Sequence, residues 1–204
     1  MSQSMVDEIV SAWPDVPMQV ANTVMEKYGP PHEATPSRLI WFNNSPWKYT
    51  ILYRDAVMHD FPVPHPDLLE QTIAYQVPSD KYDDLAEYDG SVYAARTYGE
   101  LSARCDKEGA NFLAINLAHE IITDQRDVES ARQAYGEAIQ AFMADGTMDP
   151  YMQGFQFDLP TGSQVDPDET IIGQDGDTGD DDEGIVDEVE EEVDDVTDEE
   201  TETP

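Results

Sequence analysis

The chain has 204 residues, of which 45 are Asp or Glu and only 10 are Lys or Arg, so its formal charge is −35. This imbalance disfavours a nucleic-acid partner and an anionic membrane surface, because both need clustered basic side chains. The single cysteine, Cys105, excludes an internal disulfide and a four-cysteine zinc site. The first residues show no basic segment followed by an apolar one, so no signal peptide is expected. We therefore expect a soluble cytoplasmic protein that binds neither nucleic acid nor membrane.

The acidic residues are not confined to the C-terminus. Of the 45 acids, 21 lie from Asp158 onward, which leaves 24 acids against all 10 basic residues in residues 1–157, a formal charge of −14. Like charges at this density destabilise a compact state in dilute buffer, and molar salt screens them. The acidic body favours a protein adapted to a salt-rich cytoplasm. The alternative is an ordinary acidic protein that carries a long acidic tail.

The first half of the chain predicts two helices followed by a β-hairpin. Residues 5–12 and 15–28 have apolar side chains at helical spacing, and Pro14 separates the two segments. The hairpin is expected over residues 38–54. Its first strand, RLIWF, reads as buried on both faces, and its second strand alternates aromatic or apolar with polar residues.

The middle of the chain predicts two short helices and a third strand. DLLEQTIAY (67–75) has helical spacing, and Asp67 with Glu70 has the spacing of a capping box. A second short helix is expected over residues 79–88. The segment SVYAART (91–97) then predicts a strand that joins the hairpin in a small antiparallel sheet.

Two longer helices are predicted next, as a C-terminal helical hairpin. Thr97 and Glu100 have capping-box spacing, so one helix is expected to run from there to Ile122. The last helix is expected over residues 128–143, and Gly146 ends it. The fold class is therefore α+β, with a small sheet packed against helices.

The domain organisation follows from the composition. Residues 149–160 still hold aromatic side chains and are expected to pack on the body, so we predict one compact domain over residues 1–160. Residues 161–204 are dominated by acids, Gly and Thr and are predicted to be a disordered acidic tail. Four valines of the tail have helical spacing and favour docking of an induced helix on a partner, although a disordered polyanion is the simpler interpretation.

The stretch HDFPVPHPD, residues 59–67, raises the sharpest chemical question of the sequence. His59 and His65 lie in a proline-rich segment, where Asp60 or Asp67 would complete a set of metal ligands. The alternative is structural: the prolines stiffen the chain, and His65 and Asp67 serve the start of the next helix. The absence of a third ligand at short range favours the structural interpretation, with no metal and no cofactor bound.

A second group of polar residues falls on the predicted helix 97–122. Glu108 and His119 lie on its apolar stripe, so we expect both to be mostly buried and hydrogen-bonded, with Arg104 near Glu108. These residues define a candidate pocket, and a buried polar network that fixes the docking of the helix is the alternative. The complete set of candidate pocket residues is His59, His65, Arg104, Glu108, Asn111, Asn116 and His119.

Three functional hypotheses remain from these patterns. The favoured one is a non-catalytic domain that binds a protein or a small ligand through the aromatic hairpin and the polar helix. The second is a small metal-dependent hydrolase that uses His59, His65 and His119, with Glu108 as the general base. The third is a chaperone-like protein, or a binder of basic partners, that acts through the acidic tail.

Overall fold

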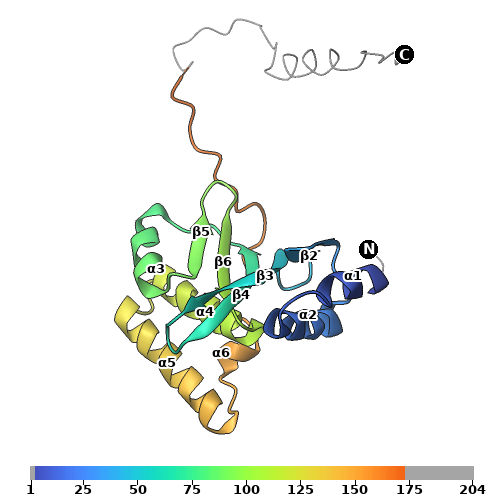
Figure 1. The fold of residues 1–204 in the computed structure, drawn as a ribbon. Helices are drawn as coiled ribbons and strands as arrows, with labels where there is room; N and C mark the ends of the chain where they lie inside the picture. Colours follow the sequence, from blue (N-terminus) through green and yellow to red (C-terminus); the bar gives the residue numbers. More distant parts are fainter. Residues whose placement is uncertain (1–2, 173–204) are drawn as a thin grey trace, which may run out of the picture. The chain divides into compact units, whose positions relative to one another are not determined.

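The computed structural model describes residues 3–172, and residues up to Pro167 form one compact unit (Figure 1). The described part of the chain contains six α-helices, a short 3-10 helix and one sheet of six antiparallel strands. The predicted α+β class is therefore confirmed. The helices are α1 (Gln3–Val10), α2 (Asp15–Tyr28), α3 (Tyr82–Tyr88), α4 (Glu108–Ile122), α5 (Val128–Asp145) and α6 (Pro150–Gln153), with the 3-10 helix at Ser79–Lys81.

The sheet has the strand order β1-β2-β3-β4-β6-β5. The predicted hairpin corresponds to β2 and β3, which pair antiparallel with Leu39 opposite Leu52. In β2 only Leu39 and Trp41 are buried, so the expectation that RLIWF is buried on both faces is wrong. The strands are β1 (Glu33–Thr35), β2 (Arg38–Phe42), β3 (Tyr49–His59), β4 (His65–Ala74), β5 (Val92–Ala95) and β6 (Glu100–Cys105).

Residues 67–75 do not form the predicted helix, because most of them lie in the central strand β4. Seven consecutive residues of this strand, from Asp67 to Ile73, are buried. A strand that is buried on both faces loses the alternation that identifies strands from sequence, and its apolar residues then mimic helical spacing. Asp67 therefore caps no helix, and the expected cost of about 1 kcal/mol for removing a cap no longer applies to it.

The predicted long helix 97–122 is divided into a strand and a helix. Strand β6 occupies residues 100–105 and pairs with both β4 and β5, and α4 begins only at Glu108. Leu101, Ala103 and Cys105 are buried at alternate positions of β6. The tertiary pairing on both sides of this strand therefore overrides the local helical spacing.

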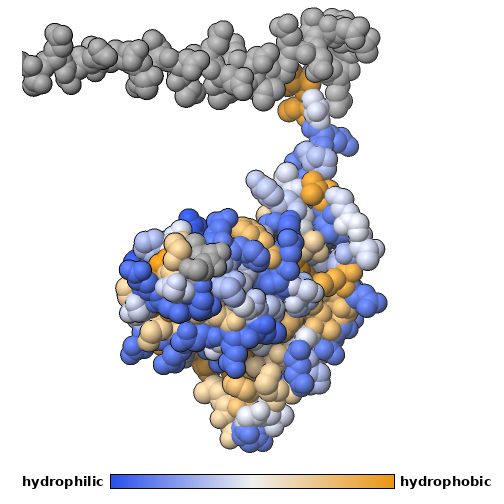
Figure 2. Space-filling view, turned by 90° about the vertical axis from the view of Figure 1, so that its right-hand side faces the viewer, coloured by the Kyte–Doolittle hydropathy of each residue, from blue (hydrophilic) through white to orange (hydrophobic). Residues whose placement is uncertain are grey.

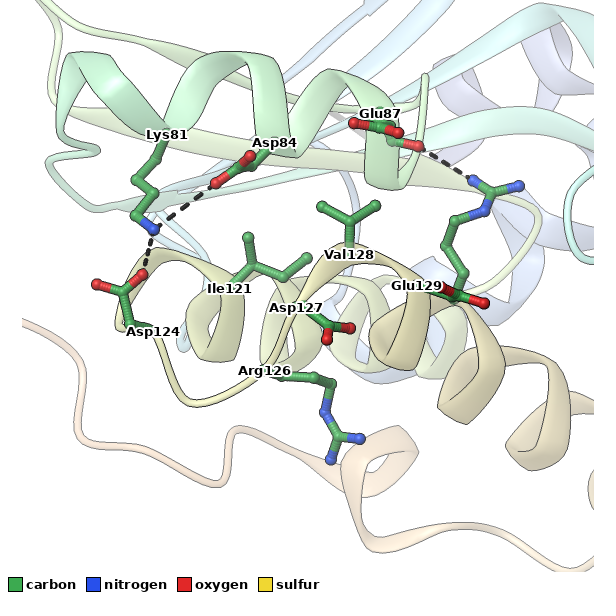
Figure 3. Close-up of a pocket in the computed structure, with 10 residues that line it drawn as sticks. Lys81, Asp84, Glu87, Ile121, Asp124, Arg126, Asp127, Val128 and Glu129 are labelled. Atoms are coloured by element: carbon green, nitrogen blue, oxygen red, sulfur yellow. Dashed lines mark hydrogen bonds and ion pairs between the residues drawn. The ribbon is translucent and has the colours of Figure 1, made fainter.

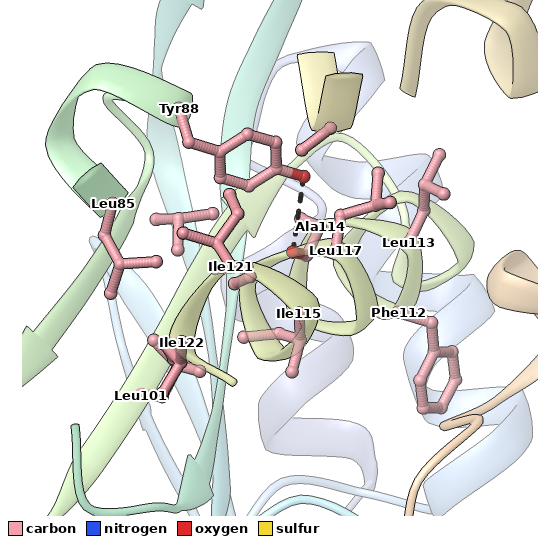
Figure 4. Close-up of a cluster of buried hydrophobic side chains, with 14 of the residues drawn as sticks. Leu85, Tyr88, Leu101, Phe112, Leu113, Ala114, Ile115, Leu117, Ile121 and Ile122 are labelled. Atoms are coloured by element: carbon pink, nitrogen blue, oxygen red, sulfur yellow. Dashed lines mark hydrogen bonds between the residues drawn. The ribbon is translucent and has the colours of Figure 1, made fainter. Parts of the chain in front are cut away.

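The hydrophobic core lies where α4 packs against the sheet and against α3, α5 and α6 (Figure 4). Nearly every side chain of α4 is buried, and Tyr88 donates a hydrogen bond of 3.3 Å to the Ala114 carbonyl. A second apolar cluster joins α1 and α2 to β2, β3 and β4, with Trp41 fully buried in it.

In the C-terminal part of the compact unit, the last long helix and the segment after it lie where the sequence predicted them. Helix α5 covers the predicted range 128–143 and ends at Gly146, which has a left-handed φ of 80°. Aromatic residues 151, 155 and 157 pack on the core, which confirms that residues 149–160 return to the body. Contacts with the body also extend beyond residue 160, since the Asp166 amide donates a hydrogen bond to the Thr97 carbonyl at 3.3 Å. The predicted disordered tail falls largely on residues 173–204, which lie outside the described residues.

Candidate functional site

The end of the β3–β4 hairpin brings two histidines and an aspartate together. The strand register places His59 directly opposite His65, and their ring centroids are 5.2 Å apart. Asp67 follows two residues later in β4, on the same face of the strand as His65. One ligand atom from each of the three residues lies within 4.8 Å of the other two. Of the two acids that the sequence offered as a third ligand, Asp60 and Asp67, the hairpin pairing therefore brings Asp67 to the two histidines.

Asp67 is the buried centre of this group, with only 4% of its surface exposed. His65 Nε2 lies 3.1 Å from Asp67 Oδ1, and His59 Nδ1 lies 3.3 Å from Oδ2. The Ser91 hydroxyl donates to Oδ2, but Oδ1 accepts no hydrogen bond of good geometry. A buried carboxylate oxygen without a well-directed donor is costly unless a cation compensates it.

Each imidazole also has its second nitrogen engaged. His65 Nδ1 lies 2.8 Å from the Val63 carbonyl, so it carries the proton and donates it. His59 Nε2 faces Asp89 Oδ1 at 3.8 Å, and the Ser91 amide donates to the same oxygen at 2.8 Å. In metal sites, a ligating histidine commonly directs its other ring nitrogen to a carbonyl or carboxylate, which fixes the ring and its tautomer.

This arrangement requires a positive charge between His65 and Asp67. With Nδ1–H donated to Val63, a neutral His65 would direct the lone pair of Nε2 at a carboxylate oxygen. Contact with Asp67, and secondarily with Cys105, raises the pKa of His65 to about 11. Either a proton on Nε2 or a metal ion between the two residues satisfies the geometry. Burial also raises the pKa of the neighbouring Asp89, so the cluster contains a second group, in addition to His65, whose pKa is shifted.

The ligand atoms lie near the spacing of a small divalent ion. A tetrahedral zinc with bonds of about 2.0–2.1 Å holds its ligand atoms about 3.3 Å apart. His65 Nε2 lies 3.1 Å from Asp67 Oδ1, and His59 Nδ1 lies 3.3 Å from the other oxygen, Oδ2. One atom from each residue lies within 4.8 Å of the other two, so the three side chains must move closer together to hold one ion.

His119 does not belong to this group. Its Nδ1 lies 2.8 Å from the Tyr75 hydroxyl, and its ring stacks on Phe157 with centroids 3.9 Å apart. Burial lowers the pKa of His119, which favours the neutral ring. The predicted pocket residues therefore do not form one site. His59 and His65 lie side by side, whereas His119 packs against aromatic side chains at the C-terminal end of α4.

Arg104 and Glu108 also differ from the prediction, because they lie in different elements. Arg104 in β6 donates to Glu70 in β4, and it does not bridge to Glu108. Glu108 is largely buried and hydrogen-bonded, as expected, but its donors come from α2, β4 and the loop before β3.

The two asparagines of the candidate pocket serve the structure of the body. The Asn111 side chain donates to the Leu69 carbonyl at 2.9 Å and to Gln71 at 3.0 Å. Asn116 donates to the carbonyls of Tyr151 and Gly154, at 3.0 and 2.9 Å. These contacts support the alternative of a buried polar network for this part of the predicted set.

A wide cleft of about 800 Å³ lies between α3 and the start of α5 (Figure 3). Its cationic groups are already engaged. Lys81 pairs with Asp124 and, at 3.6 Å, with Asp84. Arg132 donates to the carbonyls of Glu87 and Tyr88 at the end of α3. Arg126 pairs with Glu120 of α4 at 2.5 Å. Acids therefore neutralise Lys81 and Arg126, and backbone carbonyls hold the Arg132 side chain.

The sequence contained only a weak signal for the convergent site. The spacing of His65 and Asp67, two residues apart, places both on one face of a strand, but that segment was predicted as a helix. Asp89 and Ser91 join the cluster from other parts of the chain, and no local pattern marks them.

Comparison with protein-family models, with curated proteins and with solved structures finds no match for this chain. In the described part of the chain, no helix is long and apolar enough to cross a membrane.

Proposed function

We propose that this chain is a non-catalytic protein that binds one divalent transition-metal ion through His59, His65 and Asp67. The observation that carries the proposal is the orientation of both imidazoles around a buried carboxylate. Each ring directs one nitrogen at Asp67 and the other at a carbonyl or carboxylate. The proposal departs from the expectation of no metal, which depended on the prolines, on a helix start at Asp67 and on the lack of a third ligand at short range.

The chemistry of the ligands selects the class of ion. Imidazole nitrogen suits zinc, copper, nickel and iron, whereas magnesium and calcium prefer sites made of oxygen ligands. A donor set with two histidines therefore favours a transition metal over the hard cations.

Burial supports a binding role over catalysis. The side chains of His59, His65 and Asp67 are 21%, 11% and 4% exposed, which leaves little access for a substrate. A catalytic metal needs an open position for water or substrate. The hydrolase hypothesis also required His119, whose described contacts are with Tyr75 and Phe157 instead.

Metal analysis of the purified chain tests this proposal. We expect close to one equivalent of bound ion after exposure to Zn²⁺ and removal of the excess. His65→Ala and Asp67→Asn should each lose it, because each removes a ligand. His32→Ala is the matched control, since His32 lies before β1 and contacts Phe42.

Two results would count against the proposal. Wild type that takes up no zinc would leave the protonated His65–Asp67 ion pair as the full account of the cluster. Equal uptake by wild type and the His65→Ala variant would place the ion elsewhere.

We also propose that the protein is adapted to high salt and resides in a salt-rich cytoplasm. The support is the formal charge of −14 in residues 1–157 and a hydrophilic surface on the side of α1 and α2 (Figure 2). Binding of a protein or small-molecule partner, and action through the acidic tail, remain further proposals. The tail hypothesis concerns residues that lie largely outside the described ones.

Salt dependence of stability is the expected consequence of the acidic body. The melting temperature should rise steadily from dilute buffer to about 1 M KCl, where the Debye length is about 3 Å and repulsion is screened. A chain that ends at Pro167 should show the same trend, because the body carries its own excess of acids. A truncated chain whose melting temperature is indifferent to KCl would contradict this assignment.

A further inference from the structure

Arg132 connects the wide cleft to the proposed metal site. It belongs to α5, lines the cleft and is half-buried. Its guanidinium lies over the ring of Phe61, with Cζ 3.9 Å from the ring centroid. At this distance a cation and an aromatic face attract each other, and the planar guanidinium also packs against the ring. The side chain therefore reaches from the cleft to the loop that joins His59 to His65.

Phe61 fixes that loop to α5. The loop closes the β3–β4 hairpin, and the centroid of the Phe61 ring is 6.4 Å from that of His59. The half-buried ring also packs against the ring of Tyr135 in α5, with centroids 5.3 Å apart. Arg132 and Tyr135 are three residues apart and therefore adjacent on the helix surface. These two side chains together hold the end of the hairpin on α5.

The same guanidinium also holds a second side of the site. Arg132 donates to the Glu87 carbonyl at 3.3 Å and to the Tyr88 carbonyl, at the C-terminal end of α3. The last carbonyls of a helix have no partner within the helix, so a donor from α5 fixes where the chain leaves α3. The next residue, Asp89, is buried and directs Oδ1 toward His59 Nε2 at 3.8 Å. One side chain therefore contacts both segments that flank His59.

We propose that Arg132 is a positioning residue of the metal site, which keeps His59 directed at Asp67 by holding Phe61 and the end of α3 on α5. The proposal rests on the proposed metal-binding function. The three ligand side chains must move closer together to hold one ion, and a loop already fixed on α5 loses less conformational freedom in that step. Lysine is no substitute, because its point charge lacks the planar fork that stacks on a ring and donates to two carbonyls.

The sign of the effect separates positioning from simple electrostatics. Arg132 carries a positive charge close to a site for a cation, so removal of the charge alone would raise metal affinity. Loss of the contacts with Phe61 and α3 acts in the opposite direction. We expect Arg132→Met to lower Zn²⁺ affinity by about 10-fold, the lower end of the loss known for residues that orient metal ligands.

Titrations of the full chain with Zn²⁺ and Co²⁺ test the proposal, because the visible absorbance of bound Co²⁺ reports the geometry of its ligands. Arg132→Met should weaken binding of both ions and alter the visible bands, and Arg132→Lys should not restore either readout. Phe61→Leu keeps an apolar side chain against Tyr135 and removes the stacked ring, so it should act in the same direction. Arg126→Met is the matched control, because it removes the same charge from the same cleft and breaks only the pair with Glu120. It should leave affinity and spectrum as in wild type.

The outcomes separate the two proposals. Unchanged or higher zinc affinity in Arg132→Met and Phe61→Leu, with the wild-type Co²⁺ spectrum, would overturn the role of Arg132 and leave the three-ligand site intact. An equal loss of affinity in Arg126→Met would also overturn that role. Wild type that binds neither ion would overturn the metal-binding function and this inference together. Phe61→Leu decides by the same two readouts even if Arg132→Met does not fold.

Discussion

Saturation with Zn²⁺ is expected to raise the melting temperature of the protein by about 5–10 °C. A ligand that binds only the folded state at about 100 times its Kd adds about 2.7 kcal/mol to the free energy of unfolding. For a domain of this size, each kcal/mol shifts the melting temperature by about 2–4 °C. The stabilisation arises because His59, His65 and Asp67 converge only through the β3–β4 pairing, so the unfolded chain offers no equivalent site.

Thermal unfolding with and without metal measures this effect. Addition of EDTA should reverse the shift, and Mg²⁺ at the same concentration should not produce it. Asp67→Asn is the matched variant, because it keeps the shape of the side chain and removes its charge. A shift of equal size in Asp67→Asn, or none in wild type, would show that the cluster does not couple metal binding to folding.

Replacing Glu108 by Ala should lower the free energy of unfolding by about 3 kcal/mol, the scale of a lost buried network that includes a charged group. Glu108 is the first residue of α4, and its carboxylate accepts hydrogen bonds from four donors. Trp47 Nε1 and Gln71 Nε2 donate to Oε1 at 2.8 and 3.2 Å, and Lys27 and Tyr28 of α2 also donate. The carboxylate thus joins α2, β4 and α4, and its loss leaves partly buried donors without a partner.

The stabilisation by Glu108 is also expected to depend on pH. Burial of Glu108 opposes its ionisation, but the hydrogen bonds from Lys27, Tyr28 and Trp47 outweigh it and lower the pKa of the carboxyl. A folded-state pKa below the unfolded one means that the stabilisation is present at neutral pH and is lost as the pH falls through the folded pKa. Glu108→Gln should therefore flatten the acid limb of the stability curve.

Urea unfolding at a series of pH values from neutral to acid checks both effects. Glu26→Gln is the control, because Glu26 lies on the same helix as Lys27 and is exposed. The assignment of Glu108 would be wrong if both substitutions produced the same small change in the free energy of unfolding. It would also be wrong if Glu108→Gln left the acid limb as steep as in wild type.

The elements that could be predicted from sequence are those whose signals are local. The β2–β3 hairpin has an apolar first strand, a turn and an alternating second strand, and α5 combines an apolar face with a terminating glycine at Gly146. Their residues determine structure through neighbours a few positions away, so the pattern survives in any tertiary context. The acidic character of the body is likewise a property of composition alone.

The central strands and the site depended on tertiary structure. Residues 67–75 and 100–105 have apolar spacing that fits a helix. Pairing of β4 with β3 and β6, and of β6 with β4 and β5, makes most of them strands. A strand paired on both edges and buried on both faces is stabilised by partners remote in sequence, which no local window contains.

The candidate site was recognised only in part for the same reason. The sequence by itself singled out His59 and His65 and named Asp67 as one of two further ligands. The fold decided that His65 and Asp67 share a strand face and that His59 lies opposite His65. It also decided that His119 lies elsewhere, against Phe157. Residue types were readable from the chain, but their convergence is a property of strand register, which long-range pairing sets.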